Sequence, residues 1–402
     1  MTTPTSLPHL LLGSVDTRPD AIALVDGTRR VSYEALWNKA RALAGFMNEV
    51  GVKPGDRVAL LMGNSVEYVA AYYAVLLHGA VVVALNTAAK SRDVLNWLTH
   101  SGAALLITDA DYPEYAVLRE HIAVGLPVIV HRGEVDAAEK NTHAWEEAVS
   151  FPGRLDSLGR IQPDEPAAII YTSGTTGNPK GVGLSHRNLD SNVRSILEYL
   201  NLRADDSIVN VLPFFYSYGN SILHTHLAAG GRVVLEKSMM YPAQVLKRMT
   251  EERATGFSGV PSTYSILLNR VDLAQFDLSS LRYMTQAGGP MAPADVRRLT
   301  SLLPSVKFFV MYGQTEASAR LSYLPPERLF DKLGSIGVPI PRVRIEIHDA
   351  DGNVLPANEV GELCATGENI MRGYWNAPDL TSRVVRDGWL CTGDLAYQDE
   401  DG

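Results

Sequence analysis

Residues 167–181 read AAIIYTSGTTGNPKG, and this stretch decides the fold class of the chain. The run from Ala167 to Tyr171 is apolar, which predicts a short strand buried on both faces. It leads directly into ten residues, Thr172 to Gly181, that contain four hydroxyl side chains, three glycines and a lysine. Glycines let backbone N–H groups approach an anion, hydroxyls donate hydrogen bonds, and lysine adds positive charge. The stretch therefore predicts a phosphate-binding loop at the end of a buried strand.

The loop is not of the Walker A type. After Gly174 that motif requires a second glycine five residues on, where this chain has Pro179.

The residues around the loop predict an α/β protein. Helical and strand-like patterns alternate before it, with helices at 32–50, 65–77 and 91–101 and strands at 56–61, 81–85 and 104–108. Such alternation of Val/Ile-rich strands with helices is typical of parallel sheets covered by helices. A second alternating block runs over 167–313, and 133–164 reads as a loop-rich connector.

From residue 341 onward the pattern changes to antiparallel hairpins. Residues 342–348 alternate, a turn follows at 351–353, and 361–366 reads as another strand. We expect two parallel-sheet α/β lobes, at about 1–165 and 166–325, plus a small antiparallel β-rich lobe at 326–402.

Composition excludes several classes of protein. The chain has 402 residues and a formal net charge of −9, so a general nucleic-acid binder is not expected. Its two cysteines, Cys364 and Cys391, favour unpaired thiols in a reducing cytoplasm. The longest apolar stretch, residues 68–85, is broken by His78-Gly79, which predicts a buried helix followed by a strand and argues against integral membrane association.

Three further motifs follow strand-like runs. They are QAGGPM at 286–291, MYGQTEAS at 311–318 and WLCTGDLA at 389–396. A Gly-Gly step permits a flat ring to approach the backbone, and a carboxylate at a strand end suits a hard cation such as Mg²⁺. An aspartate can accept two hydroxyl hydrogen bonds at once, which suits a ribose.

The loop YTSGTTGNPKGV at 171–182 resembles the signature phosphate loop of the adenylate-forming superfamily. That superfamily contains acyl-CoA synthetases, adenylation domains of peptide synthetases and luciferases. The resemblance extends through 55–86, the three motifs above and GELCATGENIMRGYW at 361–375, in the order the family has them.

The resemblance implies ATP-dependent activation of a small-molecule carboxylic acid as an acyl-adenylate. Pyrophosphate leaves, and a thiol of CoA or of an acyl carrier protein's phosphopantetheine then takes the acyl group. The expected catalytic residues are Lys180, Thr175, Thr176, Thr315 and Glu316, with Glu316 and Thr176 also holding Mg²⁺. The expected nucleotide-binding residues are Thr172, Ser173, Gly174, Gly177, Gly288, Gly289, Pro290, Tyr312, Gly313, Gln314 and Asp394. Within that set Tyr312 is expected to stack on adenine and Asp394 to hold the ribose.

The chain departs from the family at the acyl pocket. Tyr216 stands where many acyl-CoA synthetases have histidine, and tyrosine cannot become a cation near neutral pH. No acidic residue occurs between Ser207 and Glu236, which argues against an ordinary α-amino acid as substrate. The expected pocket residues are Phe215, Tyr216, Tyr218, Asn220, Ser221, His224, Gly259 and Ala287.

Two alternatives stay open beside the acid–thiol ligase. One is an adenylating enzyme with an amine acceptor or a substrate that is not a carboxylic acid. The other is a nucleotide-binding module without turnover. A homodimer is also left open.

The resemblance carries one expectation about the end of the chain. In the family, a segment like Asp399-Glu400-Asp401-Gly402 leads into a hinge and a small mobile domain with a catalytic lysine. The 402 residues are therefore expected to be a truncated polypeptide or a fragment, with slow adenylation and essentially no thioester formation.

Overall fold

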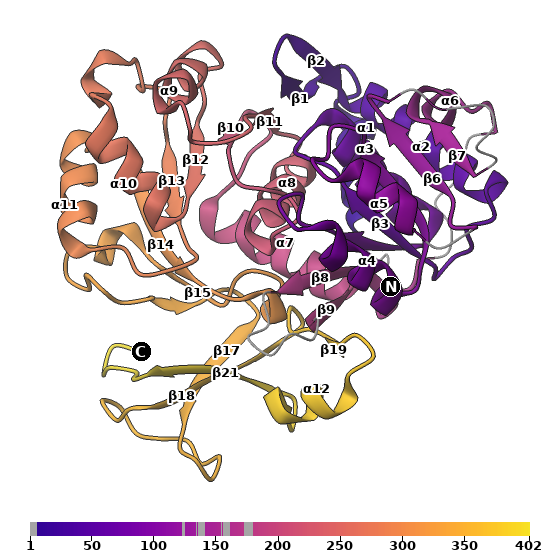
Figure 1. Cartoon of the computed structure of the whole chain (residues 1–402). Helices are drawn as coiled ribbons and strands as arrows, with labels where there is room; N and C mark the ends of the chain where they lie inside the picture. Colours follow the sequence, from indigo (N-terminus) through magenta and orange to yellow (C-terminus); the bar gives the residue numbers. More distant parts are fainter. Residues whose placement is uncertain are drawn as a thin grey trace.

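The computed structural model describes residues 6–122, 125–133, 135, 141–153, 155, 161–172 and 180–402. Its strands form three sheets, two of them large and mostly parallel and one small and antiparallel. Figure 1 shows the two large sheets side by side with helices around them, and the small sheet as a separate layer beneath. The predicted α/β class with an antiparallel β-rich part is confirmed.

The first large sheet has eight strands and surrounds the predicted buried strand. Strand β8 pairs in parallel with β4, with Val83 opposite Ile169, and antiparallel with β9. In sheet order the strands are β19 (Gly373–Tyr374), β9 (Lys180–Ser185), β8 (Pro166–Thr172), β4 (Val81–Ala84), β3 (Arg57–Leu61), β5 (Ala103–Asp109), β6 (Val128–His131) and β7 (Thr142–Ala144).

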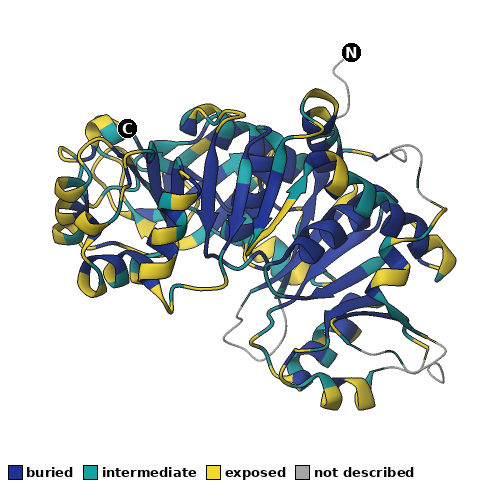
Figure 2. Ribbon diagram, turned by 90° about the horizontal axis from the view of Figure 1, so that it is seen from above, coloured by how far each residue is buried: buried dark blue, intermediate teal, exposed yellow. Residues whose placement is uncertain are grey.

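The second large sheet has nine strands, of which β1, β11, β10, β12, β13 and β14 run parallel. In sheet order the strands are β16 (Val338–Pro339), β15 (Ser322–Leu324), β14 (Lys307–Tyr312), β13 (Tyr283–Gln286), β12 (Gly256–Gly259), β10 (Ser207–Asn210), β11 (Arg232–Leu235), β1 (Ile22–Asp26) and β2 (Arg29–Ser32). The parallel strands are buried, and exposed residues gather on the outer helices (Figure 2).

The small sheet is antiparallel and is formed by strands that lie between Val343 and Ala396. Its strands, in sheet order, are β17 (Val343–His348), β18 (Gly361–Gly367), β21 (Trp389–Ala396) and β20 (Val385–Arg386). The turn between β17 and β18 begins at Asp349, whose carboxylate accepts from the N–H groups of Asp351 and Asn353 at 2.9 and 2.8 Å. The hairpin turn predicted here is confirmed.

The helices cover the faces of the large sheets. They are α1 (Leu7–Thr17), α2 (Tyr33–Glu49), α3 (Val66–His78), α4 (Ser91–Ser101), α5 (Tyr115–His121), α6 (Trp145–Val149), α7 (His186–Leu200), α8 (Ser217–Ala228), α9 (Pro242–Glu251), α10 (Pro261–Arg270), α11 (Pro293–Leu302) and α12 (Pro378–Val384). Three short 3₁₀ turns are η1 (Leu273–Gln275), η2 (Thr315–Ala317) and η3 (Pro326–Arg328).

Helix α3 shows how local signals set an element's ends. The Ser65 hydroxyl accepts from the Tyr68 N–H at 3.0 Å, which caps the helix start. Gly79 ends the helix with φ of +81°, a left-handed conformation that suits glycine. Every residue of α3 is buried, and in the part of the chain that the structure describes no helix is long and apolar enough to cross a membrane.

The connector predicted at 133–164 is not all loop. Strand β7 adds a parallel edge to β6, and helix α6 buries Trp145 and Ala148. Both elements are short, so their apolar pattern was too brief to stand out from the surrounding polar residues.

The chain crosses between the two large sheets. Strands β1 and β2 from the N-terminal part join the nine-stranded sheet, where Leu24 lies opposite Val233. Strands β8 and β9 return to the eight-stranded sheet. The lobe ranges 1–165, 166–325 and 326–402 therefore stay a proposal about domain organisation.

Candidate active site

The phosphate-loop stretch joins two paired strands. Thr172 at the end of β8 lies directly opposite Lys180 at the start of β9. Lys180 is half-buried. The predicted loop residues Ser173, Gly174, Thr175, Thr176 and Gly177 lie outside the described residues.

Three neighbouring parallel strands end beside one another and bring the later motifs together. Gly259 ends β12, Gln286 ends β13 and Tyr312 ends β14, with Gly259 opposite Gln286 and Gln286 opposite Val310. The carboxyl ends of parallel strands are where ligands bind in α/β proteins. The predicted residues that end or follow these three strands, Gly259, Ala287 to Pro290 and Tyr312 to Gln314, therefore share one edge of the nine-stranded sheet.

The segment after β13 forms a glycine turn. The Gln286 amide donates to the carbonyl of Gly289 at 2.6 Å, and Gly288 has φ of +84°. Gly288, Gly289 and Pro290 are exposed, whereas Ala287 is buried. The Gln286 Oε1 atom is buried and forms no hydrogen bond with the described residues. An unpartnered buried oxygen beside an exposed glycine turn is an available acceptor for a ligand.

Strand β14 ends at Tyr312, and the backbone of the next residue, Gly313, is closely packed against another segment. A Cβ at Gly313 would lie 2.2 Å from the Ala319 carbonyl oxygen, so no other residue fits there without displacing backbone. The next residue, Gln314, is half-buried with an Nε2 atom that forms no hydrogen bond with the described residues.

Tyr312 and Asp394 meet although they are far apart in sequence. The Tyr312 hydroxyl donates to Asp394 Oδ2 at 2.6 Å. Burial, together with the Asp394 carboxylate, raises the pKa of Tyr312, so the phenol keeps its proton at neutral pH. Tyr312, from the nine-stranded sheet, and Asp394, from the small sheet, both line a cavity of about 610 Å³. That volume is within the range of small-molecule sites.

Glu316 lies where two sheets meet. Its Oε1 accepts from the Tyr374 hydroxyl at 2.7 Å, and its backbone carbonyl accepts from the Met371 N–H at 2.7 Å. Burial and the neighbouring Glu316 carboxylate raise the pKa of Tyr374, so this phenol is a neutral donor. Glu316 Oε2 forms no hydrogen bond with the described residues. A carboxylate held by one oxygen with the other free fits a hard cation such as Mg²⁺.

Thr315 connects the nucleotide side of the site with the predicted acyl pocket. Its Oγ1 lies 3.3 Å from Ser217 Oγ at the start of α8. Tyr218, the next residue on α8, donates to the Thr285 carbonyl at 3.0 Å and contacts its hydroxyl at 2.8 Å. The Ser217 contact places the start of α8 against Thr315, and the Tyr218 contacts place it against Thr285 on β13.

The predicted pocket residues divide into two groups. Tyr216 is 50% exposed, and Phe215 packs against its ring with centroids 4.6 Å apart. Asn220, in contrast, is buried and bonded to the Tyr72 hydroxyl at 3.1 Å and to the Phe214 carbonyl at 3.1 Å, which are contacts of the core.

Two further predicted pocket residues, Ser221 and His224, are also buried. With Ser217 and Asn220 they line a cavity of about 10 Å³, which has room for about one water molecule. Burial lowers the pKa of His224 to about 3, so this imidazole is neutral. A metal pair with His226 is not formed, because the His226 Nε2 atom bonds the Tyr283 hydroxyl at 2.6 Å.

Sequence reasoning missed two residues of the site, Tyr374 and Arg320. Tyr374 lies on β19 within the quoted segment 361–375, but a lone tyrosine there had no signal of its own. Arg320 is buried with its guanidinium 4.1 Å from the centroid of the Tyr218 ring. Both contacts join segments far apart in sequence, so no spacing rule reveals them.

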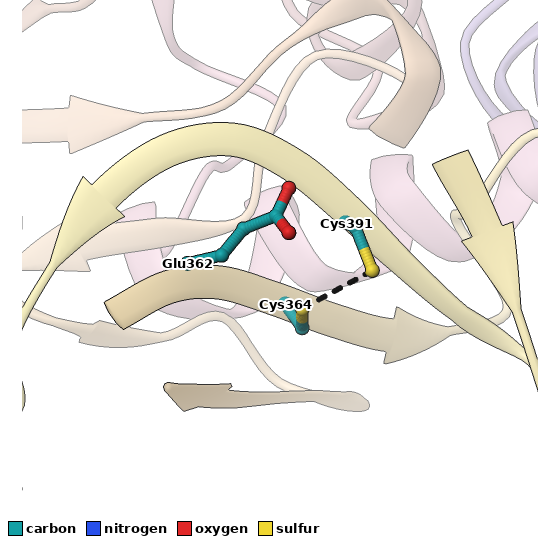
Figure 3. A group of neighbouring side chains, drawn as sticks. All are labelled: Glu362, Cys364 and Cys391. Carbon is teal, nitrogen blue, oxygen red and sulfur yellow. Dashed lines mark hydrogen bonds between the residues drawn. The ribbon is translucent and has the colours of Figure 1, made fainter. Parts of the chain in front are cut away.

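The two cysteines lie opposite each other on β18 and β21, next to Glu362 (Figure 3). Their sulfur atoms are 3.3 Å apart and both thiols are free, as predicted. Burial raises the pKa of Cys364 to about 12, with the neighbouring Cys391 thiol adding to the effect.

The geometry can be compared with known proteins. The family model described as AMP-binding enzyme matches residues 13–375, and the chain belongs to this family. It is 35% identical over 386 residues to a feruloyl-CoA synthase from Amycolatopsis, covering 96% of this chain and 74% of that protein. It is 30% identical over 427 aligned residues to a long-chain-fatty-acid–CoA ligase from Salmonella typhimurium, covering 99% of this chain and 75% of that protein.

A solved structure shares both the fold and part of the sequence. The o-succinylbenzoate CoA synthetase from Bacillus subtilis, solved in complex with its acyl-adenylate intermediate, superposes with a TM-score of 0.86 at 29% identity. The match covers all of this chain and 77% of that one. The sequence-based recognition of the adenylate-forming superfamily is confirmed.

Proposed function

We propose that this protein activates a carboxylic acid with ATP and passes the acyl group to a thiol. The observation that supports the proposal best is the 3.3 Å contact between Thr315 and Ser217, which joins the nucleotide motifs to the pocket at the strand ends. Membership of the AMP-binding family, with CoA ligases as relatives, supports the same reaction.

In the first step a carboxylate oxygen of the acid bonds to the α-phosphorus of ATP, and the bond to pyrophosphate breaks. Lys180 and the loop hydroxyls neutralise the phosphate oxygens, and Thr315 donates to the α-phosphate. Glu316 would hold Mg²⁺, and the ion would supply positive charge to the developing pyrophosphate. Tyr312 and the glycine turn at 288–290 hold the adenine, and Asp394 accepts from the ribose hydroxyls.

In the second step a thiol sulfur bonds to the acyl carbon and AMP leaves. We propose CoA as the acceptor, because the relatives named above are CoA ligases. A carrier-protein phosphopantetheine is the other acceptor to test. A cytoplasmic location and a homodimer belong to the same proposal and are checked by fractionation and by light scattering.

The test is ATP–pyrophosphate exchange with a panel of acids. Exchange should require Mg²⁺ and a particular acid, and Glu316→Ala should reduce its rate at least 100-fold while Lys180→Ala has a milder effect. The matched control is Glu327→Ala, a change at an exposed glutamate on η3. Absence of exchange with every acid, in a protein that binds AMP, refutes the ligase and leaves a nucleotide-binding module.

A further inference from the structure

Two cysteines and a glutamate on the small sheet form a group of metal-ligand side chains. Cys364 on β18 lies directly opposite Cys391 on β21, with 3.3 Å between the two sulfur atoms. Glu362 precedes Cys364 by two residues, and one ligand atom from each of the three residues lies within 4.8 Å of the others (Figure 3). In the part of the chain that the structure describes, no other group of three His, Cys, Asp or Glu residues brings its ligand atoms this close.

The neighbouring strand β17 places two more such side chains on the same face of the sheet. Residues directly opposite each other in antiparallel strands point to the same side. Glu346 lies opposite Cys364, and His348 lies opposite Glu362. The His348 Nε2 atom and the Glu346 carboxylate are 3.1 Å apart. Alternate residues point to the other side, where Leu363 lines the cavity of about 610 Å³, so the cysteines face away from that cavity.

The ligand types and their spacing fit a zinc ion. Zn²⁺ binds thiolate sulfur at about 2.3 Å and carboxylate oxygen at about 2.0–2.2 Å in tetrahedral geometry. Two sulfur atoms bound in this way are about 3.8 Å apart. The Cys364 and Cys391 sulfur atoms are 3.3 Å apart, so small side-chain rotations suffice. Thiolates disfavour Mg²⁺ and Ca²⁺, and the carboxylate disfavours Cu⁺, which prefers sulfur.

Hydrogen bonding and exposure suit Glu362 to this role. Its Oε1 accepts from the Gly393 N–H at 3.0 Å, which fixes the direction of the carboxylate. Partners of this kind orient the ligands of metal sites. Glu362 is half-buried and Gly393 is exposed, so an ion can reach the group from solvent although Cys364 is fully buried. Water can complete the fourth position on this side.

The group lies at the base of a bulge in β21. Cys391 faces Cys364, whereas the next paired residue of β21 beyond the irregular register, Leu395, faces Glu362. Two residues along β18 therefore correspond to four along β21. The extra residues include Asp394, which is the expected ribose-binding residue. A metal ion that joins Cys391 to Cys364 and Glu362 ties the base of this bulge to β18.

We propose that Cys364, Cys391 and Glu362 bind one zinc ion, which links β18 to β21 beside the bulge that carries Asp394. Each thiol gives up its proton when the metal binds, so Zn²⁺ and two thiols yield the bound ion and two protons. This site is separate from the proposed Mg²⁺ site at Glu316, which lies on η2. Binding of zinc does not depend on the adenylation reaction, so the two proposals stand or fall separately.

The test is a titration of the reduced, metal-free protein with Co²⁺, which takes zinc positions and absorbs in the near ultraviolet when thiolates bind it. Wild type should bind one Co²⁺ with this absorption, which Zn²⁺ should displace and excess Mg²⁺ should not. Loss of an outer partner of a metal ligand costs roughly 10- to 100-fold in affinity, and Cys391→Ser, which removes a ligand, should cost more. Glu362→Gln keeps an oxygen for the Gly393 N–H and should weaken binding at least about 10-fold. The matched control, Glu359→Gln at an exposed glutamate before β18, should bind Co²⁺ like wild type.

The outcomes decide between a zinc site and a pair of thiols. Calorimetry with Zn²⁺ in buffers of different ionisation enthalpy should show release of about one proton from each thiol. Absence of thiolate-to-cobalt absorption in the folded, reduced wild type overturns the proposal. So does a Co²⁺ affinity that both Cys391→Ser and Glu362→Gln leave unaltered. A reduced protein that binds no Zn²⁺ but forms a Cys364–Cys391 disulfide with peroxide also overturns it. Should Cys391→Ser unfold, Glu362→Gln decides, and an affinity equal to that of wild type overturns the proposal.

Discussion

The hydrogen bond from Tyr374 to Glu316 gives the sharpest test of how the site is built. In Tyr374→Phe the ring remains and only the hydroxyl that donates to Glu316 Oε1 at 2.7 Å is lost. A hydrogen bond to a charged group contributes about 1.5–3 kcal/mol, which corresponds to roughly 10- to 150-fold in an equilibrium constant. Because Glu316 is the proposed Mg²⁺ ligand, this loss should appear in the metal dependence of the reaction, as it does when the partner of a metal ligand is removed.

The assay is the rate of pyrophosphate exchange as a function of free Mg²⁺, with ATP and acid held constant. We expect the Mg²⁺ concentration for half-maximal rate to rise at least 10-fold in Tyr374→Phe. The control is Tyr241→Phe, which removes the hydroxyl of a tyrosine that is 63% exposed at the start of α9. An unchanged Mg²⁺ dependence in a folded Tyr374→Phe protein refutes the reasoning that Tyr374 orients the metal ligand.

Three further predictions test other parts of the site and the core. Gly313→Ala places a Cβ 2.2 Å from the Ala319 carbonyl oxygen, so we expect a loss of about 1–3 kcal/mol in unfolding free energy, measured in urea, and weaker AMP binding. Asp394→Asn should weaken AMP binding about 10-fold by calorimetry, whereas the exposed Asp387→Asn should not. Burial lowers the pKa of His224 to about 3 in the folded protein, below the usual value near 6.5, so the unfolded chain binds the extra proton first. The contribution of neutral His224 to the unfolding free energy should therefore be fully present above pH 6.5 and fall as the pH drops toward 3, by about 2 kcal/mol at pH 5. Urea unfolding at pH 7 and pH 5 measures this loss, and His224→Leu should not show it.

Local sequence signals predicted much of the secondary structure. Ser65 and Gly79 set the ends of α3, and Ser32 caps α2 by accepting from the Ala35 N–H at 3.2 Å. These signals act within one turn of chain, so they are readable without tertiary context. The short elements β7 and α6 were missed because their apolar pattern spans too few residues to rise above a charged background.

The motifs also predicted which strand ends would lie together. Gly259, Gln286 and Tyr312 each end a strand, and parallel strands end at the same edge of a sheet. The composition of the motifs therefore predicted an anion-binding loop, a glycine turn and a carboxylate for a cation. The roles of the individual residues remain predictions.

Periodicity and short contiguous motifs were enough to predict the class of fold, the family and the kinds of chemical group expected at the site. Which distant groups meet depends on tertiary packing. Tyr374 reaches Glu316 from a strand fifty-eight residues away, and Tyr312 reaches Asp394 across eighty-two. Arg320 is buried against Tyr218 with no carboxylate of the described residues beside it. Contacts of this kind are fixed by how sheets pack, and that packing is set by the whole chain rather than by any one segment.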